Sequence, residues 1–152
     1  MKQAHSSKKS NRWSRGVIAV ELAIITPFMA LVIMGIVDLG LMAREHQVIQ
    51  NAAREGARYS SLHSSRIDSD LNPGFTAANI TSRVVAYCAR EGVTVTPADV
   101  GVDQTKTVVV GGLTLPASEV TANKTYTFIT PGMSNLLGTM TMEGVGLFRN
   151  LY

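Results

Sequence analysis

The chain has 152 residues, of which 45% are hydrophobic and 16% are charged, a composition ordinary for one globular domain that carries a lipid-facing segment. Its formal net charge is +3, but residues 1–16 hold five of the fourteen basic residues and no acidic residue. The other nine basic and eleven acidic residues leave the rest of the chain slightly acidic, which argues against nucleic acid as a partner.

Residues 1–15 are polar, basic and rich in serine, which predicts a disordered leader. The run from Val17 to Val37 that follows is charged only at Glu21. As a helix it would be about 31 Å long, close to the thickness of a bilayer's hydrocarbon core. A buried helix of a soluble protein is the alternative, but so small a domain could hardly cover it. The basic leader predicts a cytoplasmic N-terminus, with everything after about Arg44 on the far side of the membrane.

Ordinary signal cleavage after the run is disfavoured. The run is longer than a secretory core, and Leu41 and Ala43 follow it in place of two small residues. Lipoprotein processing would need a cysteine directly after the run, and the only cysteine is Cys88.

The helical pattern continues past Arg44, because Val48/Ile49, Ala52/Ala53 and Gly56/Ala57 recur at helical spacing. The sequence therefore predicts one helix from about residue 17 to residue 60, with a bend or local loosening at Pro27. The small residues of its second half would allow another element to approach closely.

Residues 60–75 are polar, contain Pro and Gly, and predict a loop. Residues 76–92 predict a second, amphipathic helix with Ile80, Val84, Tyr87 and Cys88 on one face and Gly92 as its stop signal. Cys88 could be a reactive or intermolecularly bridged thiol, but its place on the apolar face favours a small buried core residue.

From Val93 the pattern alternates with a period of two, over five segments. Gly111 and Gly112 separate two β-rich runs, as a two-residue hairpin requires. Short strands in sequence predict an antiparallel meander covered by a helix. The predicted fold class is thus α+β: a long N-terminal helix, then a small head with a second helix and an antiparallel sheet.

Recognisable chemistry is sparse. The three histidines, His5, His46 and His63, lack metal-ligand spacing, and Asp68 and Asp70 are too few to specify a calcium loop. The sequence has no phosphate-binding glycine loop, paired-cysteine motif or nucleophile elbow. We therefore expect no enzymatic activity, no metal and no cofactor.

Two carboxylates remain in or beside the apolar run. Asp38 stands where the run ends, so solvation at the membrane interface would explain it, and a polar contact with a partner helix is the alternative. Glu21 costs more, because a carboxylate inside a bilayer span is unfavourable by up to roughly 3 kcal/mol on insertion scales. It either reaches back to the interface near Arg15 or has a specific use.

Gly16, four intervening residues and Glu21, set between a basic leader and an apolar run, resemble the prepilin-peptidase site of type IV pilins and pseudopilins. Over residues 15–61, the chain resembles the TadE-like pseudopilin family of tight-adherence (Tad, type IVc) pili. The resemblance lies in the Ala-Val-Glu step, the proline after it, the Gly-Ile-Val-Asp-Leu-Gly end and the continuation NAAREGARY. Leu22 departs from the phenylalanine often found after this glutamate.

The resemblance implies cleavage between Gly16 and Val17 by a separate membrane aspartyl peptidase on the cytoplasmic side. It divides the chain into a removed leader (1–16), a transmembrane assembly helix (17–43) and a periplasmic or extracellular head (44–152). Glu21 would become the fifth residue of the mature chain.

The implied protein is a minor pilin of the bacterial inner membrane that takes part in pilus assembly and adhesion. Its implied partners are prepilin peptidase, other pilin and pseudopilin subunits, the inner-membrane assembly platform and membrane lipid. The short C-terminal region disfavours the TadG paralogue but does not separate TadE from TadF. An uncleaved single-span anchor with a periplasmic binding or scaffolding domain is one alternative, and a type II secretion pseudopilin is another.

Overall fold

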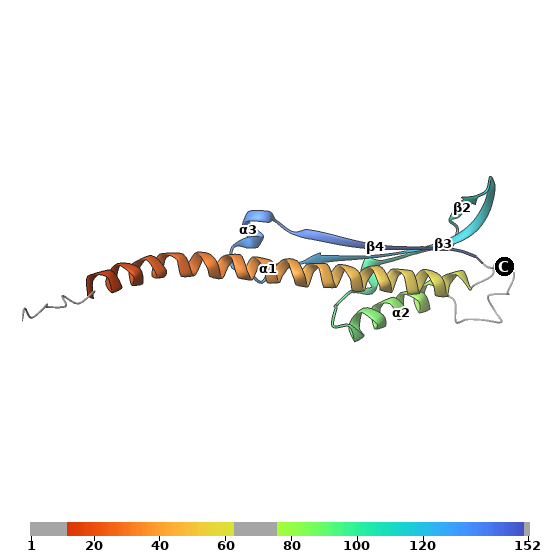
Figure 1. Ribbon diagram of the computed structural model, residues 1–152. Helices are drawn as coiled ribbons and strands as arrows, with labels where there is room; N and C mark the ends of the chain where they lie inside the picture. The colour runs from red at the N-terminus through yellow and green to blue at the C-terminus, as the bar shows by residue number, and fades with distance from the viewer. Residues whose placement is uncertain (1–11, 63–75, 151–152) are drawn as a thin grey trace, which may run out of the picture. The chain divides into compact units, whose positions relative to one another are not determined.

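A computed structural model describes residues 12–62 and 76–150, with side chains from Gly16 onward (Figure 1). The predicted leader up to residue 11 and residues 63–75 of the predicted loop lie outside the described residues. The contacts divide the chain after Val37 into two units, residues 1–37 and 38–152, and each is described by itself. The domain division predicted from the sequence ends the transmembrane helix at residue 43 and begins the head at residue 44. That membrane boundary stays a prediction.

The order of elements confirms the predicted α+β class: a long helix, a second helix and then an antiparallel sheet. In chain order they are α1 (Arg12–Ser61), α2 (Ala77–Arg90), the 3₁₀ turn η2 (Pro97–Asp99), β1 (Val100–Asp103), β2 (Thr107–Val110), β3 (Leu113–Tyr126), α3 (Met133–Leu137) and β4 (Met140–Arg149).

Helix α1 confirms the single helix predicted for residues 17–60, but it begins earlier, at Arg12. The prediction of disorder was therefore wrong for residues 12–15. Neither glycine nor proline occurs among these four residues, and adding a residue to an existing helix costs far less than starting one.

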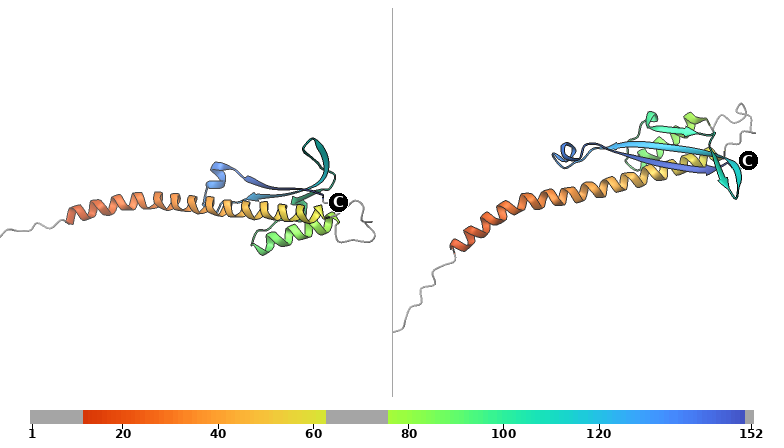
Figure 2. Two further views of the ribbon diagram at one scale, coloured as in Figure 1. Left: turned by 45° about the vertical axis from the view of Figure 1, so that its right-hand side comes forward. Right: turned by 90° about the horizontal axis from the view of Figure 1, so that it is seen from above.

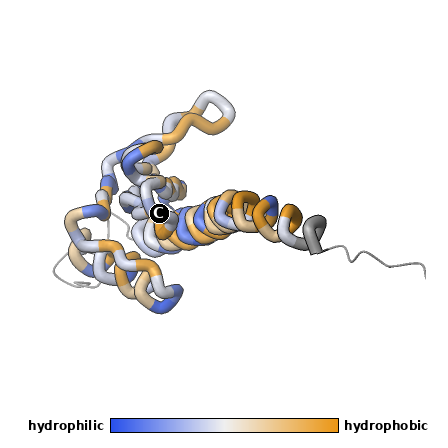
Figure 3. The backbone as a smooth tube through the Cα atoms, turned by 90° about the vertical axis from the view of Figure 1, so that its left-hand side faces the viewer, coloured by the Kyte–Doolittle hydropathy of each residue, from blue (hydrophilic) through white to orange (hydrophobic). Residues whose placement is uncertain are grey.

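The first unit contains the apolar part of α1. An 18-residue window in this helix has a mean hydropathy of 2.5, and 0% of it is buried within the structure. Figure 3 shows apolar residues in orange along this part of the helix. A core helix of a soluble protein would be covered, so the length, composition and exposure are compatible with a membrane anchor.

In the second unit, α1 packs on α2 and on the sheet through the predicted small-residue stripe. A Cβ atom placed on Gly56 would lie 2.5 Å from Cγ2 of Val84 in α2 and 3.2 Å from Cγ1 of Val120 in β3. Ala52, Ala53 and Ala57 are fully buried. The small side chains thus let two elements meet the same part of α1.

Strand β4 approaches α1 at two glycines. A Cβ on Gly144 would lie 2.7 Å from the carbonyl oxygen of Ile49, and one on Gly146 would overlap the carbonyl group of Ala53. Between these glycines, the amide of Gln50 donates to the Val145 carbonyl oxygen (2.8 Å) and accepts from its N–H (3.2 Å). The helix therefore binds the strand backbone directly.

The sheet is organised around β3. Strand β2 pairs with its first four residues, β1 pairs with Glu119–Ala122, and β4 pairs with Ala117–Tyr126, all antiparallel. The views in Figure 2 show β3 and β4 side by side. The predicted meander was wrong, because β1 pairs with β3 and not with its neighbour in sequence; a strand of 14 residues is long enough to pair with several partners.

Other local predictions have mixed outcomes. The Gly111–Gly112 hairpin is confirmed: Val110 pairs with Leu113, and both glycines have positive φ, +60° and +83°, as a type I′ turn requires. Val93 and Val95 are buried but are not in a strand, contrary to the alternating pattern.

Helix α2 forms as predicted. The Thr76 hydroxyl accepts a hydrogen bond from the Asn79 N–H at the helix start, and Gly92 has a positive φ of +75° just past its end. Ile80, Val84 and Cys88 are its buried residues. The prediction that Cys88 is a small core residue is confirmed, because its exposed fraction is 0%.

Candidate functional site

The residues around the predicted processing site lie near the start of α1. Gly16 is helical, and nothing lies within 4 Å of a Cβ placed on it. Val17 is 66% exposed. Among the described residues, the peptide bond between Gly16 and Val17 is thus uncovered. Glycine makes local unwinding of the helix easier at this position, since it stabilises a helix interior by about 1 kcal/mol less than alanine.

Glu21 is exposed on α1 within the apolar run. Within the part of the chain that the structure describes, its carboxylate has neither a hydrogen-bond donor nor an ion-pair partner. Among the described residues, the Glu21 carboxylate therefore makes no hydrogen bond or ion pair that would stabilise the fold.

Pro27 lies inside α1, and the helix assignment continues without a break on both sides of it. One residue earlier, the Thr26 hydroxyl donates to the Leu22 carbonyl oxygen at 2.6 Å. The predicted bend stays a prediction, whereas an interruption of the helix is absent among the described residues.

Asp38, the first residue of the second unit, is 1% exposed. One carboxylate oxygen, Oδ1, accepts from the Ile129 N–H at 2.9 Å, and Oδ2 accepts from the Thr130 N–H at 2.9 Å. The Tyr126 hydroxyl lies 3.2 Å from both Oδ1 and the Asp38 backbone carbonyl oxygen. We call this cluster, Asp38 with Tyr126, Ile129 and Thr130, the Asp38 anchor.

The Asp38 anchor differs from the expectation of a solvated carboxylate. Its donors belong to the same chain, 88 to 92 residues away in sequence. Two consecutive backbone N–H groups that converge on one carboxylate replace water as its hydrogen-bond donors, so the acid can be buried without a cation. The alternative expectation, a contact with a partner helix, stays a prediction.

Sequence reasoning missed the three partners of Asp38. The hydroxyl of Tyr126 was hidden in an alternating segment, and the other two donors are backbone groups, which no residue pattern reveals. The aromatic ring of Tyr126 also packs edge-on against Phe128, with centroids 5.4 Å apart and planes at 86°. Hydrogen bonds to Asp38 thus attach the stretch after β3 to α1, and the ring contact packs the end of β3 against that stretch.

Ion pairs hold the rest of the head to α1. Lys124 Nζ lies 2.8 Å from Glu45 Oε2, with both side chains about one-fifth exposed. Helix α2 is joined to α1 by Arg83, which pairs with Glu55 at 2.9 Å. The guanidinium of Arg83 also stacks 4.6 Å from the centre of the Tyr59 ring. Glu45 and Glu55 thus link α1 to β3 and to α2.

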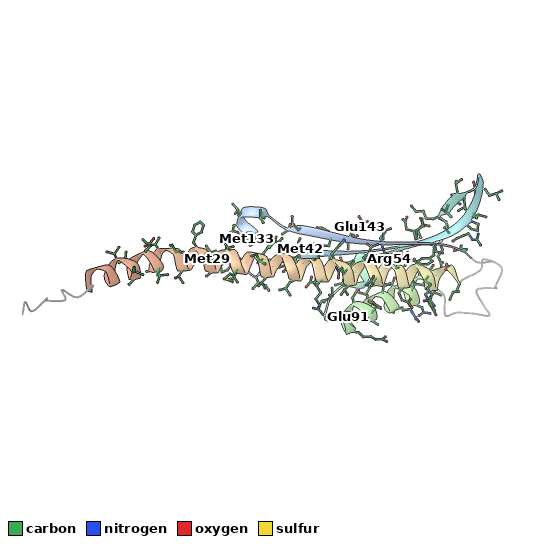
Figure 4. All side chains as sticks on the ribbon, viewed as in Figure 1. Met29, Met42, Arg54, Glu91, Met133 and Glu143 are labelled. Atoms are coloured by element: carbon green, nitrogen blue, oxygen red, sulfur yellow. The ribbon has the colours of Figure 1, made fainter. Side chains whose placement is uncertain are left out.

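Metal-binding geometry is absent from the described residues, where no three His, Cys, Asp or Glu side chains cluster. His46 borders an open, largely apolar hollow of about 420 Å³ that is lined by three methionines and four other residues. The lining residues are Met42, Ala43, His46, Met140, Thr141, Met142 and Glu143. Figure 4 shows Met42 on α1 and Glu143 on β4.

The matched part of the chain lies within α1. Residues 16–58 match the TadE-like protein family. No curated protein and no solved structure matched the chain. The matched residues run from Gly16, through the apolar run and Asp38, to the small-residue stripe that packs on α2 and the sheet. The segment that matches this family, 43 of the 152 residues, is therefore one helix that runs through both units.

Proposed function

We propose that this TadE-like chain is a minor pilin, or pseudopilin, of a Tad (type IVc) pilus that takes part in pilus assembly and adhesion. The observation that carries the proposal is that the family match covers 16–58 as one continuous helix. A pilin helix needs two different halves. One half has to be apolar and uncovered, so that it can contact lipid or neighbouring subunits, and the other half has to pack against the head.

In this proposal the chain is inserted in the bacterial inner membrane with its N-terminus in the cytoplasm and its head in the periplasm. Prepilin peptidase cuts between Gly16 and Val17, which removes all five basic residues of the leader. The trimmed subunit then joins other pilin and pseudopilin subunits through the inner-membrane assembly platform and acts there without catalysis.

Glu21 supplies the assembly contact in this proposal. Cleavage creates a positively charged amine at Val17, and the exposed Glu21 of a neighbouring subunit neutralises it inside a helix bundle of low dielectric constant. The absence of a partner for Glu21 among the described residues supports an intermolecular role. An unpaired carboxylate would be costly there, so the contact would set the register between subunits.

The test is the mass and N-terminal sequence of the protein isolated from its native membranes. We expect a mature chain that begins at Val17. A chain that keeps its leader would refute processing and favour the alternative of a plain single-span anchor. Co-purification with secretion components in place of pilus subunits would favour the type II secretion alternative.

Substitution of Glu21 tests the assembly contact. We expect Glu21→Ala and the isosteric Glu21→Gln to be trimmed at Gly16 but to be incorporated poorly into pili, because both lack the negative charge. Glu143→Ala, which removes an exposed carboxylate of the head, is the matched control and should assemble normally. Incorporation of Glu21→Gln at the unmodified level, measured by immunoblot of sheared pili, would show that the charge has no pairing role.

A further inference from the structure

The connection from β3 to β4, which carries α3, is exposed and uncharged. Between Lys124 and Glu143 the chain has 18 residues without Asp, Glu, Lys, Arg or His. Its large apolar side chains are open to solvent: Ile129 is 64% exposed, Leu136 80% and Leu137 54%. We call residues 127–139 the α3 loop.

Such a surface is unusual for a connection that faces water. Exposed loops normally carry charged and polar residues, and α3 buries none of its five residues. Met133, the first residue of α3, is labelled in Figure 4. Nothing in the described head covers Leu136 or Leu137, so the α3 loop has an apolar surface without a partner inside the chain.

The Asp38 anchor holds the α3 loop next to one position on α1. Asp38 follows Val37, the last residue of the apolar run, and it holds the Ile129 and Thr130 N–H groups at 2.9 Å. These two residues lie in the first part of the α3 loop. Whatever the orientation of the head, the loop is therefore tied to the point where the apolar run ends.

We infer that the α3 loop rests in the interface of the lipid leaflet from which α1 emerges. This inference rests on the proposed membrane insertion of α1, with the span taken to end at Val37, where the apolar run ends, and not at residue 43 as the resemblance implies. Lipid is the occupant that continuity favours, because a span that ends at Val37 places the anchored loop at the headgroup level. The loop's composition agrees: Leu, Ile and Met can enter the acyl boundary, Ser, Thr and Asn can stay among the headgroups, and no charge opposes insertion.

The α3 loop then gives the head a second attachment beside the span. Interfacial segments bury their apolar face about 5–10 Å into the boundary between headgroups and acyl chains. Two attachments would limit how the head turns about α1 while the subunit waits in the membrane. A subunit that leaves the membrane for a filament has to withdraw both.

Quenching of tryptophan by brominated lipids tests this inference with the full chain in phosphatidylcholine–phosphatidylglycerol vesicles. Trp13, the only tryptophan, is first replaced (Trp13→Phe). Leu136→Trp then reports on the α3 loop and Val32→Trp on the span. Val109→Trp is the matched control, because Val109 is an apolar residue on β2 whose exposed fraction, 67%, lies between those of Leu136 and Leu137.

We expect Leu136→Trp to be quenched most by lipids brominated near the carboxyl end of the acyl chains. Val32→Trp should be quenched most by deeper bromines, and Val109→Trp by neither. Leu137→Trp provides a second reporter at an exposed site in the loop. Quenching of Val32→Trp without quenching of either loop reporter would overturn this inference alone. The same holds if a loop reporter has blue-shifted emission but is not quenched, because another copy of the protein, and not lipid, would then cover the loop. Failure to quench Val32→Trp would refute the membrane insertion on which the proposed function rests as well.

Discussion

Replacement of Asp38 by alanine should release the start of the α3 loop from α1. The substitution removes the acceptor of two backbone hydrogen bonds of 2.9 Å, from Ile129 and Thr130. A backbone N–H that stays buried without an acceptor costs about 1–3 kcal/mol. The bond from Thr130 is buried and the bond from Ile129 is only partly so. We therefore expect the two together to lose about 2–4 kcal/mol of local stability, with the Ile129 amide at the lower end of that range.

Hydrogen exchange measures this loss directly, because amides in the loop exchange when it opens. A loss of about 2–4 kcal/mol corresponds to exchange that is about 30-fold to 1,000-fold faster at Ile129 and Thr130. Amides in the paired centre of β3, such as Val120, should change much less, since α1 and β4 still hold that strand.

Asp103→Ala is the matched control. Asp103 accepts from the backbone N–H (2.9 Å) and the hydroxyl (2.7 Å) of Thr105 in an exposed turn. Its replacement should speed exchange at Thr105 and leave Ile129 and Thr130 unchanged. If Asp38→Ala leaves the exchange of Ile129 and Thr130 within twofold, roughly 0.4 kcal/mol, the Asp38 anchor does not hold the loop and the reasoning is refuted.

Three further outcomes follow from the packing and hydrogen bonds of the head. Gly146→Ala should lower the free energy of unfolding by about 1–3 kcal/mol or more, because its Cβ would overlap α1; Gly40→Ala, which meets nothing within 4 Å, should not lower it in the same denaturant titration. Burial raises the pKa of the Cys88 thiol, so iodoacetamide should modify it in unfolded protein far faster than in folded protein, and equal rates would contradict its core position. The hydroxyl and then the amide of Thr96 hold the pKa of Asp99 below its ordinary value. Its contribution to stability is therefore complete above the unfolded-state pKa, about 3.9, and is lost as the pH falls through the lower folded value. An NMR titration midpoint for Asp99 at or above 3.9 would contradict this.

The elements that local patterns predict well are those whose residues carry their own periodic signal. The spacing of Ile80, Val84 and Cys88 predicts α2 and its buried face, and the Gly111–Gly112 pair predicts the hairpin. The small residues of α1 predict a close approach by another element, and Gly56 provides it. The hypothesis of processing at Gly16 is equally local, since it needs only Gly16, Glu21 and their charge context, and it stays a prediction.

Pairing between distant segments is where the predictions failed. An alternating pattern tells which faces of a strand are buried but not which strand lies beside it, so β3 was not predicted as the common partner of β1, β2 and β4. The same limit explains Val93 and Val95, whose alternation reflects burial against the core without a neighbouring strand.

The sequence by itself determined the long helix, its uncovered apolar half and the isolated carboxylate Glu21, because each depends on spacing within one segment. Only the tertiary structure decided the use of Asp38. Its donors are backbone groups of Ile129 and Thr130, which come within hydrogen-bonding distance only after β3 has docked on α1. A backbone N–H is the same in nearly every residue, so its partner is set by where the fold places it and leaves no mark in the sequence.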